Sequence, residues 1–172
     1  MGMLLSVNRL ALKSLTALLA ALALACLGGC SGDTKPSHGH GGHHHEPPHG
    51  GTAIDLGEEE AHVEFLLDAA AGKLTAYVLK AHMAGFQRIT QESLELVATV
   101  GGKPETLTLK AVANAATGEK AGDTSQFEAQ ADWLKAAKTF DAELKSITVR
   151  DKAYTALKFN FPKGEAPAAV NK

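Results

Sequence analysis

The sequence predicts an all-β fold for most of the chain after residue 51. From Thr52 onward, apolar residues recur with a period of two in short runs, which is the spacing of side chains on one face of a strand. Residues that favour turns separate these runs roughly every 8 to 15 residues. The segment 52–162 is also long enough to bury a core without disulfides. These three observations favour an immunoglobulin-like antiparallel β-sandwich with one short helix.

Eight segments of this domain have the alternating pattern of a strand. The predicted strands are Thr52–Leu56, Ala61–Asp68, Lys73–Lys80, Ser93–Val100, Glu105–Val112, Thr124–Ala129, Glu143–Val149 and Tyr154–Phe161. Hairpin turns are expected at Ala69–Gly72, Gly101–Pro104 and Asp151–Lys152, because Gly, Pro and Asp favour tight turns. The Ala- and Pro-rich tail, residues 163–172, is expected to be disordered.

The one expected helix covers Ala131–Lys138. Trp133, Leu134 and Ala137 would share one face of this helix, and Asp132 would lie in its first turn, where an acidic side chain is favourable. We expect Trp133 to fill a place in the core rather than to stack on a ligand.

The first predicted hairpin has one apolar and one polar face. With a four-residue turn, His62 lies opposite Leu79 and Glu64 lies opposite Tyr77. The apolar face points into the core and consists of Val63, Phe65, Leu67, Leu74, Ala76 and Val78. His62 and Glu64 share the other face, about 7 Å apart at the backbone.

His62 and Glu64 are therefore candidate metal ligands. A histidine and a carboxylate at this spacing can share one metal ion, and His82 would approach from the end of the sheet. The alternative is an exposed polar face on which His62 and Glu64 form a hydrogen bond without a metal. The residues alone leave both interpretations open.

Residues 1–29 are expected to be a signal peptide. Arg9 and Lys13 make the start of the chain basic, and the 16 residues Ser14–Gly29 carry no charge and are rich in Leu and Ala. This uncharged run is shorter than the roughly 20 residues that a membrane-spanning helix needs. The pattern predicts export from the cytoplasm.

The uncharged run ends in Leu27-Gly28-Gly29-Cys30, which resembles the lipobox of bacterial lipoproteins. In that motif the cysteine is diacylated and becomes the new N-terminus, so Cys30 is the predicted lipidation site, and Cys26 lies in a poorer match. Ser31 follows where Asp is the usual signal for retention in the inner membrane. We expect a lipid-anchored envelope protein on the periplasmic side, with the outer membrane favoured, or outside the cell. The alternatives are a plain secretory signal and an uncleaved anchor, and both also place the rest of the chain outside the cytoplasm.

Cleavage before Cys30 changes the chemistry that remains. It removes Arg9 and Lys13 from the 17 basic residues and none of the 19 acidic ones, so the net charge changes from -2 to -4. Lipidation consumes the last thiol, which excludes disulfides, a cysteine nucleophile and thiolate metal sites. The absence of a basic field excludes nucleic acid as a partner.

Residues 30–51 form a predicted His-rich tether between the lipid and the domain. The tether has no aliphatic side chain after the lipobox and is rich in Gly and Pro, so it is expected to be disordered. Its six histidines are the main candidate metal ligands: His38, His40, His43, His44, His45 and His49. Imidazole without thiolate suits Zn(II), Cu(II), Ni(II) or Co(II) rather than Ca(II) or Mg(II). The alternative is a hydrophilic spacer that gains charge as the pH falls through about 6.5.

The stretch 48–82 resembles a group of small bacterial envelope lipoproteins. In that group a His/Gly-rich segment ends in H-G-G, and a strand closing in Leu-Gly, a strand with H-x-E and a strand with Y-x-L follow. The matching residues are His49, Gly50, Gly51, Leu56, Gly57, His62, Glu64, Tyr77 and Leu79. Lys80 stands where the group has an acid, and Ala61 where it has an aromatic residue. The resemblance implies a lipoprotein with a β domain and a metal-related role.

The sequence therefore predicts a metal-binding lipoprotein that acts as a buffer or chaperone and passes ions to an efflux or uptake protein. The alternative is a non-catalytic structural or protein-interaction domain whose His-rich tether is a spacer, which responds to pH. An enzyme is not expected. The chain lacks the nucleophile-elbow, zinc-protease and phosphate-loop motifs, and the polar cluster at His62 and Glu64 has no nucleophile beside it.

Overall fold

The computed structural model describes residues 46–165 of the 172-residue chain. The predicted signal peptide, Cys30, the first five histidines of the tether and residues 166–172 of the predicted tail lie outside the described residues. No helix within 46–165 is long and apolar enough to cross a membrane.

The described part of the chain is all-β, as predicted. Its strands are β1 (Thr52–Leu56), β2 (Ala61–Asp68), β3 (Lys73–Lys80), β4 (Ser93–Val100), β5 (Lys103–Ala111), β6 (Gln126–Gln130), β7 (Phe140–Val149), β8 (Lys152–Phe161) and β9 (Gly164–Glu165). Two single turns of 3₁₀-helix, η1 (Ala81–Met83) and η2 (Asp132–Lys135), stand between strands.

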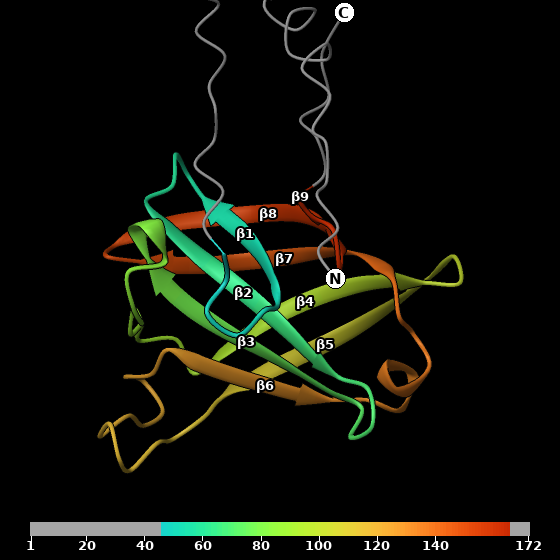
Figure 1. Cartoon of the computed structure of the whole chain (residues 1–172), viewed down its shortest axis with the longest axis horizontal. Helices are drawn as coiled ribbons and strands as arrows, with labels where there is room; N and C mark the ends of the chain where they lie inside the picture. The colour runs from blue at the N-terminus through green and yellow to red at the C-terminus, as the bar shows by residue number, and fades with distance from the viewer. Residues whose placement is uncertain (1–45, 166–172) are drawn as a thin grey trace, which may run out of the picture. The chain divides into compact units, whose positions relative to one another are not determined.

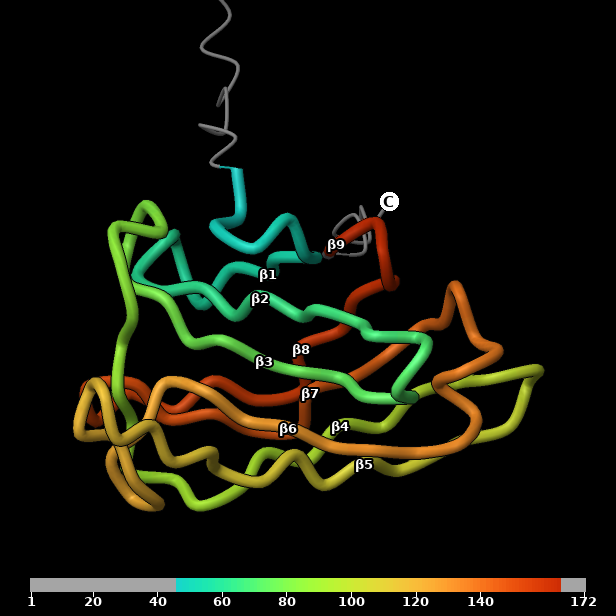
Figure 2. The backbone as a smooth tube through the Cα atoms, turned by 60° about the horizontal axis from the view of Figure 1, so that its bottom comes forward, coloured from blue at the N-terminus to red at the C-terminus, as the bar shows by residue number. Residues whose placement is uncertain are grey.

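All nine strands join in one antiparallel sheet in the order β1-β2-β3-β6-β5-β4-β7-β8-β9 (Figure 1). The sheet curls until its two ends meet, since β1 lies against β8 and β9. The backbones of β9 and β1 approach closely: a Cβ atom added to Gly164 of β9 would lie only 3.2 Å from the carbonyl oxygen of Ala53 in β1. The fold is thus nearly closed into a barrel. Figure 2 shows β1, β2 and β3 on one side of the domain and β4 and β5 on the other.

The predicted register of the first hairpin is confirmed. His62 pairs with Leu79 and Glu64 with Tyr77 across β2 and β3. The apolar face points into a core that includes the ring of Phe65, stacked on Phe159 of β8 at 4.7 Å between centroids. Alternation of apolar residues therefore placed each side chain on the correct face of this hairpin.

Two further hairpins turn over two residues each. Gly101 and Gly102 connect β4 to β5 with φ of 57° and 79°, whereas Lys103 and Pro104, which were predicted to be part of this turn, already belong to β5. The third turn lies one residue earlier than predicted, at Arg150 and Asp151, with φ of 50° and 66°. Lys152 is already part of β8.

The predicted helix at Ala131–Lys138 is wrong in extent. Only η2 forms there, closed by the bond from the Leu134 amide to the Ala131 carbonyl. Leu134 is fully buried, and Trp133 packs edge-on against Phe140 at 5.4 Å. After η2 the amides of Ala136 and Ala137 both bond to the carbonyl of Trp133, so the turn closes instead of continuing as a helix toward β7 at Phe140.

Candidate functional site

The outer face of β2 and β3 carries the side chains that the sequence singled out. His62 and Glu64 lie on this face together, as predicted, but their exposed fractions are 2% and 0%. The expectation of an exposed polar face is therefore wrong. Residues 47–51, named here the docking segment, bind Glu64 through the backbone amides of His49 and Gly51. Phe86 forms a β-bridge with Leu79 of β3. These two segments arrive from outside the hairpin and remove its outer face from water.

Glu64 holds the docking segment through three hydrogen bonds. Its Oε1 atom accepts the backbone amides of His49 at 2.9 Å and of Gly51 at 2.8 Å. Its Oε2 atom lies 2.7 Å from Nδ1 of the His49 ring. The buried carboxylate is thereby satisfied at both oxygens, as a buried charge requires.

The two glycines of the docking segment make this contact sterically feasible. Gly50 has φ of +69°, and its amide closes a turn onto the carbonyl of Pro47 at 3.0 Å. A Cβ atom on Gly51 would lie 2.5 Å from the backbone oxygen of Phe65, closer than real Cβ atoms come. Residues 47–51 are thus part of the fold. His49, the last histidine of the predicted tether, is therefore bound to the sheet.

Aromatic rings flank His49 on the same face. The imidazole stacks on the Tyr77 ring with 3.9 Å between centroids and 13° between planes. Phe86 lies 5.8 Å from the imidazole and is 49% exposed. Burial, with the negative charge of Glu128, raises the pKa of the Tyr77 phenol, so the phenol stays protonated at neutral pH.

His62 has a partner of its own. Its Nδ1 atom lies 2.8 Å from Oδ1 of Asp55, the residue opposite it on β1. Its Nε2 atom is buried and has no hydrogen-bond partner among the described residues. No hydrogen bond joins His62 to Glu64 in this part of the chain. Each side chain of the predicted pair is turned toward a different neighbour.

His82 lies at the end of β3, as the sequence suggested. Its ring is 62% exposed, and Nδ1 lies 3.8 Å from Oε2 of Glu59 in the turn between β1 and β2. Within residues 46–165, no group of three or more His, Cys, Asp or Glu side chains is arranged to hold a metal ion. The folded domain therefore offers single, carboxylate-paired histidines rather than a complete metal cage.

Sequence reasoning missed the pairing of His49 with Glu64. The pair spans 15 residues, and no strand register predicts it. The available signal was the H-G-G motif, since two consecutive glycines beside a histidine indicate a close backbone approach. The pairing of His62 with Asp55 was accessible in principle, because the register of β1 on β2 places them opposite each other.

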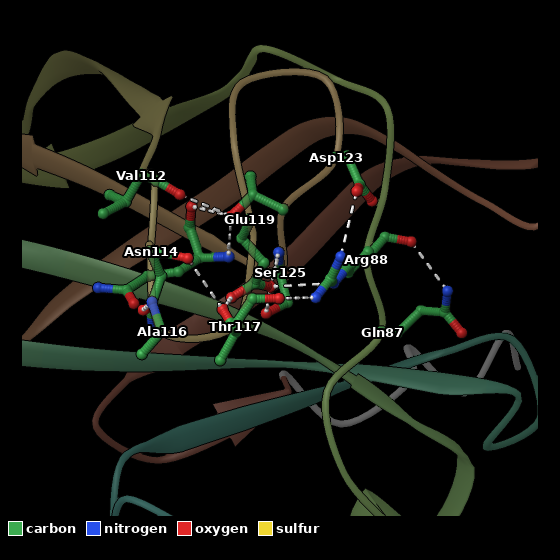
Figure 3. A network of polar contacts seen from close by, with 11 residues as sticks. Gln87, Arg88, Val112, Asn114, Ala116, Thr117, Glu119, Asp123 and Ser125 are labelled. Atoms are coloured by element: carbon green, nitrogen blue, oxygen red, sulfur yellow. Dashed lines mark hydrogen bonds and ion pairs between the residues drawn. The ribbon is translucent and has the colours of Figure 1, made fainter.

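A second carboxylate with little side-chain exposure, Glu119, lies far along the chain, in the loop between β5 and β6 (Figure 3). Glu119 accepts hydrogen bonds from the Ser125 amide at 3.0 Å, the Ser125 hydroxyl at 2.6 Å and the Thr117 hydroxyl at 2.7 Å. Arg88 approaches Glu119 at 3.8 Å and pairs with Asp123 at 3.1 Å. These bonds connect residues of the loop with one another and with Arg88, which lies before β4.

Comparison with known proteins gave no relatives: no family model, no curated protein and no solved structure matches this chain.

Proposed function

We propose that this protein is a lipid-anchored envelope protein that binds Zn(II), Cu(II), Ni(II) or Co(II) through its His-rich tether and serves as a metal buffer or chaperone. The observation that carries the proposal is the position of His49. It is the last of six histidines between His38 and His49, and Glu64 holds it on the folded domain. The ligand-rich segment therefore starts from a fixed point on the β domain.

The composition of the tether supports capture and release. Imidazole is a good donor for these borderline ions, and separate histidines exchange more readily than the ligands of a closed structural site. No thiol follows Cys30 in the sequence, so imidazole is the strongest donor for such metals in the mature chain. Lipidation at Cys30 would keep the protein at the membrane, where an efflux or uptake protein would exchange the ion.

Metal titration of the full chain in detergent tests this function. Zn(II), Cu(II), Ni(II) and Co(II) are titrated into the wild type and into a variant with His38, His40, His43, His44 and His45 replaced by Ser, using calorimetry. We expect the variant to lose most of the bound ions, whereas the single control His82→Asn keeps the wild-type stoichiometry. If the wild-type chain shows no saturable binding at micromolar metal concentrations, the proposed function is wrong.

One observation favours the alternative, a non-catalytic interaction domain with a His-rich spacer. Phe86 is a large hydrophobic side chain that is 49% exposed, beside the stacked rings of His49 and Tyr77. Exposed aromatic residues are enriched where proteins bind partners. This alternative predicts that the five-serine variant grows like the wild type under metal stress, while Phe86→Ser abolishes cross-linking to an envelope protein.

A further inference from the structure

The environment of His49 differs from that of a histidine in a water-exposed segment. Four contacts fix the residue: its amide and Nδ1 bind Glu64, its ring stacks on Tyr77, and the Gly50 turn closes behind it. The side chain nevertheless remains 28% exposed. The ring is thus held by Glu64 at one edge and by Tyr77 on one face, while part of it remains accessible to solvent.

Glu64 also determines which ring nitrogen is available. A carboxylate accepts hydrogen bonds, so Nδ1 of His49 carries the proton and donates it to Oε2. In the neutral ring Nε2 then holds the lone pair. Histidines that bind metals in proteins commonly donate their other N–H to a carboxylate, which fixes the tautomer and makes the ligating nitrogen more basic.

We propose that Nε2 of His49 is the first and tightest ligand for the metal ion, and that Glu64 is the positioning residue that prepares it. This inference rests on the proposed metal-binding function. Imidazole nitrogen suits a borderline divalent ion.

The arrangement predicts a coupling between metal and fold. An ion on Nε2 withdraws electron density from the ring and strengthens the bond from Nδ1–H to Glu64. Since that bond attaches the docking segment to β2, metal binding stabilises the folded domain, and the folded domain in turn favours metal binding. Histidines that bind metal without contacting the domain would leave its thermal unfolding unchanged.

The test uses the full chain in detergent with Zn(II) as the probe. Affinity for the tightest ion is measured by competition with a chelator, and the unfolding midpoint is measured with and without Zn(II). We expect Glu64→Gln to weaken the tightest binding by about 10- to 100-fold, because a glutamine amide donates to Nδ1 and moves the proton to Nε2. We expect His49→Gln to abolish the Zn(II)-induced rise in the midpoint.

His82 and Glu59 are the matched control, since they are another histidine and carboxylate in contact, but on the surface. His82→Asn and Glu59→Gln should leave both the tightest affinity and the Zn(II)-induced rise unchanged. If a Glu64 variant does not fold, ¹⁵N NMR of the wild-type imidazoles replaces it. That spectrum should show the Nδ1–H tautomer for His49 and a metal-induced shift at Nε2.

The outcomes separate the two proposals. If the full chain binds no Zn(II), the proposed function fails. If it binds Zn(II), but His49→Gln and Glu64→Gln leave the tightest affinity and the rise in the midpoint unchanged, the inference about His49 is overturned and the proposed function stands. A wild-type NMR shift at Nδ1 of His49 instead of Nε2 would also overturn the inference.

Discussion

Glu64 and Glu119 are carboxylates with little side-chain exposure, 0% and 8%, in different parts of the molecule. Glu64 of β2 accepts hydrogen bonds from the docking segment and attaches it to the sheet, whereas Glu119 accepts hydrogen bonds from residues of its own loop between β5 and β6. The partners differ. Glu119 binds the hydroxyl groups of Ser125 and Thr117, whereas Glu64 binds an imidazole.

The two kinds of partner differ in their ability to bind a metal once they have donated a hydrogen bond to the carboxylate. A serine or threonine hydroxyl that donates to a carboxylate is used up as a donor and is a poor ligand for a transition metal. An imidazole that donates through Nδ1 keeps Nε2 as a strong donor to metals. The same carboxylate contact is therefore purely structural at Glu119, while at Glu64 it also prepares a ligand.

The largest effect is expected when Glu64 is truncated. Glu64→Ala removes a carboxylate that has no exposure and leaves the amides of His49 and Gly51 without their acceptor. We expect a loss of about 2–5 kcal/mol in the free energy of unfolding, measured by urea denaturation. Glu119→Ala should lower the free energy of unfolding by less, about 1–3 kcal/mol. The side chain of Glu119 is 8% exposed, so water can more easily reach the donors that lose their acceptor. An equal or larger loss for Glu119→Ala would contradict the ranking.

A glycine substitution tests the docking segment directly. Gly51→Ala brings a Cβ atom to 2.5 Å from the Phe65 carbonyl oxygen, which belongs to a central strand and cannot move away. We expect a loss of about 1–3 kcal/mol. The control is Gly118→Ala in the loop of Glu119, where φ is +71° but nothing lies within 4 Å, with an expected loss of about 1 kcal/mol. A larger loss of stability for Gly118→Ala than for Gly51→Ala would contradict this comparison.

Acid should weaken the Glu119 contact. Burial acts to raise the pKa of Glu119, but hydrogen bonds from Ser125 and Thr117 and the charge of Arg88 outweigh it, so the pKa lies below its ordinary value of 4.5. A carboxyl whose pKa is lower in the folded state contributes stability that is complete above about 4.5 and is lost as the pH falls through the folded value.

The matching measurement is urea unfolding of the wild type and Glu119→Gln between pH 7 and pH 3. We expect the wild type to lose its advantage over the variant on acidification below about pH 4.5. A difference between the two proteins that stays constant over the whole range would show that ionised Glu119 contributes nothing.

The smallest effect is expected at His82. Its contact with Glu59 is long, at 3.8 Å, and 62% of the histidine side chain is exposed, so His82→Asn should change stability by less than about 0.5 kcal/mol. Asparagine also tolerates the φ of 55° at this position. A loss in urea denaturation as large as that of Glu64→Ala would remove the distinction between the surface pair and the buried pair.

The sequence by itself determined the fold class and the local pairing of its hairpins. Period-two alternation set the faces of β2 and β3, because shifting a strand by one residue would turn Phe65 and Val63 out of the core. Turn chemistry located Gly101–Gly102, and it placed the last hairpin turn within one residue. Both kinds of information are local, so a single sequence contains them.

Only the tertiary structure decided what happens on the outer face of the first hairpin. His62 and Glu64 were correctly placed side by side, yet their burial and their partners come from segments that the hairpin does not contain. His49 reaches Glu64 across 15 residues, and Phe86 arrives from the chain after β3. Periodicity reports which face a side chain occupies, but a distant segment decides whether that face meets water. The free energy of burying a carboxylate depends on donors that only the folded chain brings to it.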